Sequence, residues 1–138
     1  MTRTVGAWAL WGAILGCAPE PATAIRVRIQ TDIERGELDR VSVRAERILG
    51  DPIVARDFPV RKTSAGDSFP GEVVLVPGDP DDPRPVQVDV GAHFREQGET
   101  RDFTRRAIVS FHAGRTTVLH VVLARWCVVP ANRDRCSA

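Results

Sequence analysis

The sequence has no tyrosine, few other aromatic residues and almost no excess of charge of either sign. Of its 138 residues 6% are aromatic, and 19 basic residues stand against 18 acidic ones, a formal charge of +1. A nucleic-acid binder needs a basic surface, and one that binds single strands also needs aromatic side chains for stacking. The composition therefore argues against a nucleic-acid partner. A hydrophobic content of 43% also argues against a disordered chain, and the length allows one domain.

Long hydrophobic runs are also missing, and the longest uncharged stretch lies at the N-terminus. Residues 5–16 carry no charge and follow a single cation, Arg3. A helix over these twelve residues would span about 18 Å, less than the ~30 Å hydrocarbon core of a bilayer. The stretch therefore predicts a signal peptide rather than a membrane span; a buried N-terminal helix is the alternative.

Two cleavage sites compete beyond this stretch. Residues 14–17 (ILGC) resemble the bacterial lipobox, in which the cysteine is acylated and becomes the mature N-terminus. Residues 22–24 (ATA) have the A-x-A form of an ordinary signal peptidase site but lie farther from the uncharged stretch. We predict a lipoprotein signal peptide over residues 1–16, acylation of Cys17 with palmitate among its chains, and lipid anchoring to a bacterial membrane in the cell envelope. Cleavage at the second site would give a secreted protein instead.

Cysteine is rare, and its count fits an exported chain. With Cys17 acylated or removed, Cys127 and Cys136 remain as a pair, and an oxidising compartment favours a disulfide between them. The short loop that they close contributes roughly 2–3 kcal/mol in the chain-entropy model. Two cysteines without a nearby histidine are too few ligands for zinc, so the bridge is predicted to be structural.

From residue 25 onward the hydrophobic pattern has the period of β-strands and shows no helical period. The predicted strands are residues 25–30, 38–46, 53–60, 69–76, 86–94, 103–111 and 117–126. The pattern predicts an all-β fold, an antiparallel seven-stranded β-sandwich over residues 25–126. An open barrel of the oligonucleotide-binding type is the alternative. Residues 17–24 are predicted to form the lipidated cysteine and a Pro/Ala tether, and residues 127–138 a disulfide-closed tail.

Two of these strands have unusual features. Pro52 and Pro59 restrict residues 53–60 to a sheet edge, because proline cannot donate a ladder hydrogen bond. Residues 117–126 are apolar on both faces, which a strand with one wet face would not be. Either this is a central strand whose outer face is covered, or it exposes an apolar sheet face to a protein partner.

Residues that could carry chemistry are few. Asp79, Asp81 and Asp82 lie in the proline-rich loop of residues 77–85 and are weak candidates for a calcium site, because calcium needs several oxygen ligands from a flexible loop. A solvated turn is the simpler interpretation, since Asp and Pro are ordinary turn residues. No serine lies in the glycine-flanked turn that exposes a nucleophile. We predict no catalytic residues and no cofactor.

The three histidines are scattered along the chain. His112 is beside a predicted turn and should be exposed. His120 lies in the strand that is apolar on both faces, so we expect a hydrogen-bonded histidine in the core or an interface. A metal site would require these residues to converge with His93 from different strands.

Residues 106–119 (RAIVSFHAGRTTVL), followed by residues 123–127 (LARWC), carry a family resemblance. They are similar to a pattern of small, mostly uncharacterised myxobacterial lipoproteins with an immunoglobulin-like or transthyretin-like sandwich. With the lipobox and residues 38–46, the resemblance covers most of residues 14–136. It implies a cell-envelope lipoprotein and transfers no catalytic residue. We expect a non-catalytic binding or structural module; the alternative is a calcium- or carbohydrate-handling envelope protein that uses residues 79–82.

Overall fold

The computed structural model describes residues 23–34, 37–63, 66–69, 71–79 and 81–128. Nine strands and one short 3₁₀ helix, η1, are the regular elements of these residues. Their bounds are β1 Ala24–Thr31, β2 Leu38–Arg47, β3 Pro52–Pro59, β4 Arg61–Thr63, β5 Gly66–Ser68, β6 Glu72–Leu75, β7 Val86–Glu96, β8 Glu99–Val109, β9 Thr116–Leu123 and η1 Arg125–Val128. The prediction of an all-β fold is confirmed.

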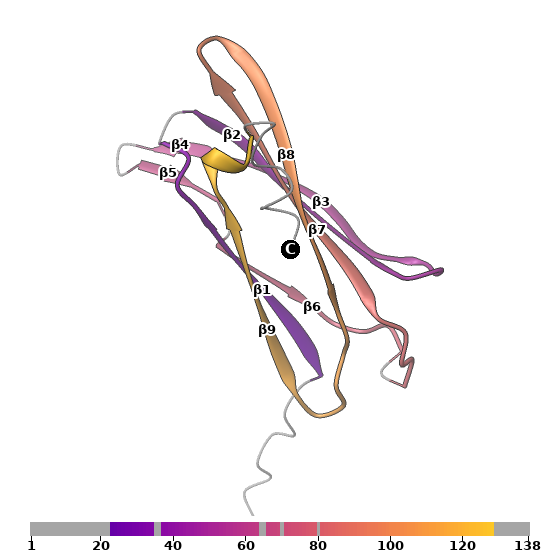
Figure 1. Ribbon diagram of the computed structural model, residues 1–138. Helices are drawn as coiled ribbons and strands as arrows, with labels where there is room; N and C mark the ends of the chain where they lie inside the picture. Colours follow the sequence, from indigo (N-terminus) through magenta and orange to yellow (C-terminus); the bar gives the residue numbers. More distant parts are fainter. Residues whose placement is uncertain (1–22, 35–36, 64–65, 70, 80, 129–138) are drawn as a thin grey trace, which may run out of the picture.

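Seven of these strands form two sheets that face each other across one core (Figure 1). The first sheet has the order β6-β1-β9 and the second the order β3-β2-β7-β8. β4 and β5 pair as a separate hairpin. β3 is the outer strand of its sheet, as Pro52 and Pro59 predicted.

One strand pair differs from the antiparallel arrangement that was predicted. β1 and β9 run parallel in unbroken register, from Ala24 opposite Thr116 to Thr31 opposite Leu123. The chain leaves the second sheet after β8 and starts β9 beside the beginning of β1, so the two strands share a direction (Figure 1). Alternation of apolar residues determines which face of a strand is buried, but carries no information on the direction of its neighbour.

The core consists of the inward-facing side chains that the alternation predicted. Phe94 and Phe103, from neighbouring strands, make an edge-to-face contact with ring centroids 6.3 Å apart. The fully buried aliphatic and aromatic side chains each contribute about 1.5–3 kcal/mol relative to exposure. They include Ile25, Val27, Val41, Val43, Leu75, Val86, Val88, Val90, Phe94 and Leu123.

The first sheet ends at β9, which is therefore an edge strand and not the covered central strand that one explanation required. On its outer face, Val118 and Val122 are 42% and 48% exposed. His120 lies between them and is exposed, so of the two expected settings the core is wrong and the interface stays a prediction. The apolar outer face of β9 is thus open to solvent.

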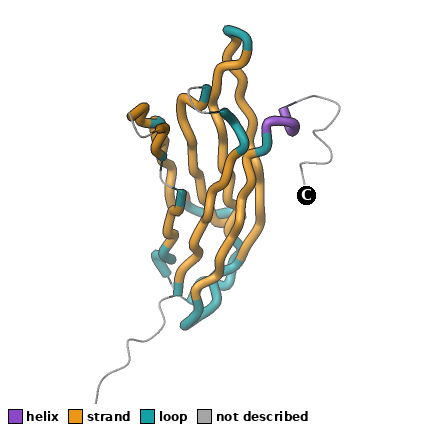
Figure 2. The backbone as a smooth tube through the Cα atoms, turned by 90° about the vertical axis from the view of Figure 1, so that its left-hand side faces the viewer, coloured by secondary structure: helices purple, strands orange, loops and turns teal. Residues whose placement is uncertain are grey.

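The two ends of the sandwich are made by different loops (Figure 2). We call the end at which β1 begins the tether end; there the register brings together the turns of residues 48–51, 76–85 and 112–115. We call the other end the far end, which carries the β7–β8 turn, the β1–β2 loop and η1. Among the described residues, no helix is long and apolar enough to cross a membrane.

Candidate binding side and supporting ion clusters

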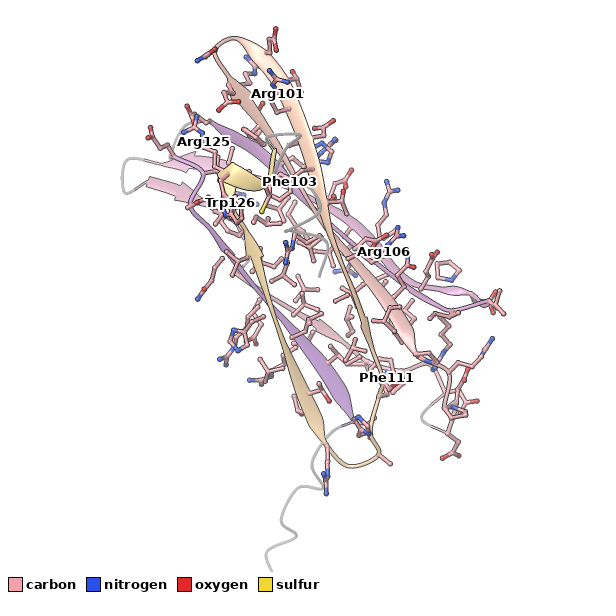
Figure 3. The ribbon with its side chains drawn as sticks, in the orientation of Figure 1. Arg101, Phe103, Arg106, Phe111, Arg125 and Trp126 are labelled. Carbon is pink, nitrogen blue, oxygen red and sulfur yellow. The ribbon has the colours of Figure 1, made fainter. Side chains whose placement is uncertain are left out.

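A cleft lies along one side of the molecule, between the edge strands β8 and β9. Its volume is about 770 Å³, and its lining comes from residues 104–108 of β8 and residues 119–121 of β9. β8 is the edge strand of one sheet and β9 is the edge strand of the other, so no strand joins the two sheets on this side of the molecule. In Figure 3 the labelled Phe103, within β8, and Phe111, two residues after β8, lie along this side.

The two edge strands of this cleft differ in how they are protected. β8 carries five charged residues in eleven, among them Asp102 and Arg106. β9 has no Asp, Glu, Lys or Arg, no proline and no register shift. Proteins protect exposed strand edges with charges, prolines or short length, because a bare edge pairs with other chains. Among the described strands that end the two sheets, β9 alone has none of these devices.

The remaining sheet edges show those devices clearly. β6 is four residues long, and β3 begins and ends with proline. On β8, Arg106 donates hydrogen bonds to both carboxylate oxygens of Asp89 on β7, at 2.8 and 3.0 Å. This interaction raises the pKa of Arg106 above its ordinary value. The outer face of the second sheet is therefore charged, whereas β9 is apolar beside the same cleft.

At the far end, Arg125 holds η1 against both sheets. Its guanidinium donates to Glu96 at the end of β7 and to Glu37 in the loop before β2, each at 3.1 Å. Its backbone N–H donates to the Asp32 carboxylate at 2.6 Å. The hydrogen bonds to Glu96 and Glu37 raise the pKa of Arg125. Figure 3 shows Arg125 and Trp126 together at this end.

At the tether end, two of the three aspartates that were the calcium candidates contact a buried arginine. Arg47, 7% exposed, donates to the carbonyl oxygens of Asp79 and Asp82 at 2.9 and 3.2 Å. Its Nε lies 3.2 Å from the Asp82 carboxylate. The guanidinium also lies 5.8 Å from the centroid of the Phe111 ring. A cation of the protein itself therefore occupies the inner side of this loop.

The Asp82 carboxylate is paired with a second arginine. Arg84 donates to it from its side chain, at 2.6 Å for the shortest contact, and from its backbone N–H at 3.0 Å. The side-chain and then the backbone hydrogen bond, helped by the nearby Arg47 charge, lower the pKa of Asp82 to about 2. Asp79 accepts from the backbone N–H of Asp81 at 3.0 Å, which makes an Asx turn. Asp79 and Asp82 therefore stabilise the conformation of this loop.

The other predicted site residues do not come together. Within the described part of the chain, no group of three His, Cys, Asp or Glu side chains is placed to hold a metal ion. His93 lies 2.6 Å from Asp102 on the outer face of the second sheet, and His112 is exposed as expected. Cys127 is buried in η1. Cys17 and Cys136 lie outside the described residues, so acylation and the disulfide stay predictions.

Arg47 was not predicted from the sequence, although its position carried a signal. Val41, Val43 and Ala45 alternate inward on β2, and Arg47 continues that phase. An arginine in an inward phase beside an acidic loop indicates a buried ion pair.

No protein-family model, curated protein or solved structure matches the chain. The function is therefore inferred from the geometry of this chain alone.

Proposed function

We propose that the protein is an exported lipoprotein of the cell envelope, anchored through Cys17, which binds a protein partner along β9 and catalyses no reaction. The observation that carries the binding role is the unprotected edge of β9, with Val118 and Val122 exposed on its outer face. An extended segment of a partner can add to such an edge as a further strand, with main-chain hydrogen bonds for affinity and side-chain contacts for specificity.

The anchoring is supported by the lipobox and the uncharged stretch before it. Metabolic labelling with an alkyne fatty acid is expected to tag the wild-type protein and not Cys17→Ser. A mature N-terminus at Ile25, measured by mass spectrometry, would contradict anchoring and leave a secreted protein.

The binding role is tested by photo-crosslinking in cells. A photoreactive amino acid at position 118 or 122, on the outer face of β9, is expected to give one discrete adduct with an envelope protein. The matched control is position 74, because Val74 is an exposed valine on the outer face of the same sheet but on the opposite edge strand. Equal adducts at positions 74 and 118, or none at position 118, would contradict the role of β9.

The alternative, a calcium- or carbohydrate-handling protein, is tested by thermal shift. A ligand at 100 times its Kd stabilises the folded state by about 2.7 kcal/mol. We expect no shift with calcium, since Asp82 is already paired with Arg47 and Arg84. A large shift that is lost in Asp81→Ala would favour the alternative.

We also propose that the sandwich is of the transthyretin-like rather than the immunoglobulin-like type. In an immunoglobulin constant domain, strands one, two, five and four share one sheet, and strands three, six and seven share the other. Counted without the β4–β5 hairpin, the strands here group as four-one-seven and three-two-five-six. This grouping supports the second of the two types in the resemblance, and a crystal structure of the exported chain tests it.

A further inference from the structure

Two exposed apolar side chains project from the tether end. Leu49, at the tip of the β2–β3 turn, is 97% exposed, and Val76, just after β6, is 63% exposed. Both lie next to the same cluster: the Leu49 carbonyl accepts from the Arg84 guanidinium at 3.4 Å, and Val76 lines a pocket together with Arg84 and Asp82. The two apolar residues thus belong to one surface.

Leu49 has a backbone conformation that does not suit leucine. Its φ is +59°, in the left-handed region where glycine and asparagine are favoured. The turn is closed by the N–H of Gly50, which donates to the carbonyl of Arg47 at 3.0 Å. The glycine of this turn, Gly50, follows Leu49, and a Cβ added to it would lie 2.7 Å from a guanidinium nitrogen of Arg84. Leu49 therefore neither packs against the protein nor favours its turn, so its presence is not explained by stability.

The described chain begins at this same end. The Gly114 N–H donates to the Thr23 hydroxyl at 2.9 Å, and the Ala24 N–H donates to the carbonyl of Arg115 at 3.2 Å. Only residues 18–22 separate Thr23 from Cys17. Extended chain covers at most 3.3–3.6 Å per residue, so an acylated Cys17 would hold Thr23 within about 20 Å of the bilayer surface.

We infer that the tether end rests on a phospholipid bilayer, with the Leu49 side chain inserted at the headgroup boundary and Val76 beside it. This inference rests on the proposed anchoring at Cys17. A contact of this size is weak by itself, but an anchor on the same molecule makes it intramolecular and raises its effective concentration.

The charges at this end indicate which lipid surface it fits. Its described charged residues are Asp51, Asp79, Asp81, Asp82, Arg47, Arg84 and Arg115, which leave no basic excess. Binding to anionic lipids would require a cluster of Lys and Arg. The surface therefore fits zwitterionic lipid, and the contact would place the far end away from the membrane plane.

Tryptophan fluorescence tests the contact. Trp126 is the only tryptophan after residue 16, so Trp126→Phe removes the native signal from the mature chain. In this background, Leu49→Trp reports on the tether end. The matched control is Gln97→Trp, since Gln97 is exposed, has a φ of +51° and lies in the β7–β8 turn at the far end. The lipidated proteins are reconstituted into phosphatidylcholine vesicles that carry bromine on the acyl chains.

We expect the emission of Leu49→Trp to shift to the blue and to be quenched at least twofold by the brominated lipid, while Gln97→Trp is unchanged. Protein that fails to float with the vesicles would refute the anchoring and the contact together. Protein that floats without quenching of Leu49→Trp, or with equal quenching of both variants, would refute the contact alone.

A second variant separates contact from folding. Leu49→Asn suits the left-handed backbone, so its denaturation midpoint should equal or exceed that of wild type. In wild type, vesicles should slow hydrogen exchange of the turn at residues 48–51, and in Leu49→Asn they should not. A lower midpoint for Leu49→Asn would show that leucine serves stability, and equal protection in both proteins would show that Leu49 makes no lipid contact.

Discussion

The buried arginine at the tether end should be among the most costly polar residues to replace. Arg47→Leu removes the guanidinium and keeps an apolar side chain of moderate size in the inward phase of β2. The substitution loses hydrogen bonds to two carbonyl oxygens and the ion pair with Asp82. Hydrogen bonds to a charged group contribute about 1.5–3 kcal/mol each.

Two features of the structure reduce the loss below the sum of these contacts. The carbonyl groups of Asp79 and Asp82 belong to a surface loop and can bind water instead. Asp82 also keeps its interaction with Arg84, so its charge is not left alone. Removing one partner of a buried pair costs about 3–5 kcal/mol where the remaining charge is uncompensated. We therefore expect Arg47→Leu to lower the free energy of unfolding by about 3 kcal/mol, near the lower end of that range.

Urea denaturation of the protein measures this loss, with circular dichroism at the β-sheet band as the signal. The matched control is Arg84→Leu, which removes the second guanidinium from the same carboxylate. Arg84 is exposed, and exposed ion pairs contribute about 0–1 kcal/mol. The reasoning would be refuted by an Arg47→Leu protein within 0.5 kcal/mol of wild type, or by a larger loss in Arg84→Leu.

Other predictions concern the second sheet, low pH and the C-terminal bridge. An added Cβ at Gly91 would clash with the Ser42 hydroxyl, so Gly91→Ala should lower the free energy of unfolding by about 1–3 kcal/mol, and Ser42→Gly should restore part of it in the double variant. The interactions that lower the pKa of Asp82 to about 2 stabilise the fold fully above the unfolded pKa near 4, and this stabilisation is lost as the pH falls toward 2. Acid titration of Asp82→Asn should lack this loss of stability. Non-reducing peptide mapping of exported protein should join Cys127 to Cys136, and free thiols at both positions would contradict the bridge.

The inward faces of the strands could be predicted from the sequence because burial on one face imposes a period of two. Val41, Val43 and Ala45 are buried as expected, and Val86 to Phe94 follow the same rule. The signal depends only on which side of each strand meets the core. It therefore survives even where the identity of the neighbouring strand is unknown.

The parallel pairing of β1 with β9 could not be predicted in this way. The direction of β9 is set by the crossover after β8, which changes sheets, and no residue pattern within either strand records it. The same limit applies to the outer face of β9. Val118 and Val122 have the same pattern whether a neighbour covers them or not, so a single strand cannot distinguish a central position from an exposed edge.

The acidic loop shows why the partner of its carboxylates could not be identified from the sequence. Three aspartates in one loop indicate that a cation lies nearby, but do not show whether it is a metal ion or a basic side chain. The structure supplies that charge from Arg47, which is far from the loop in sequence and continues the inward phase of β2. The signal was therefore present in two segments, and only their pairing in space was missing.

The functional proposals depend on residues whose type does not suit their exposure, their backbone conformation or their position in the sheet. Leu49 is apolar, fully exposed and in a conformation favoured by glycine, and Val118 and Val122 are apolar on an edge that other strands protect with charge or proline. Sequences agree with their folds at most positions, and departures concentrate where function imposes a separate demand. At the tether end, the proposed anchor on Cys17 would bring Leu49 to a lipid surface and so would account for such a demand. On β9 the exposed apolar edge lies beside the cleft. A strand of a partner protein could reach this edge in an anchored molecule.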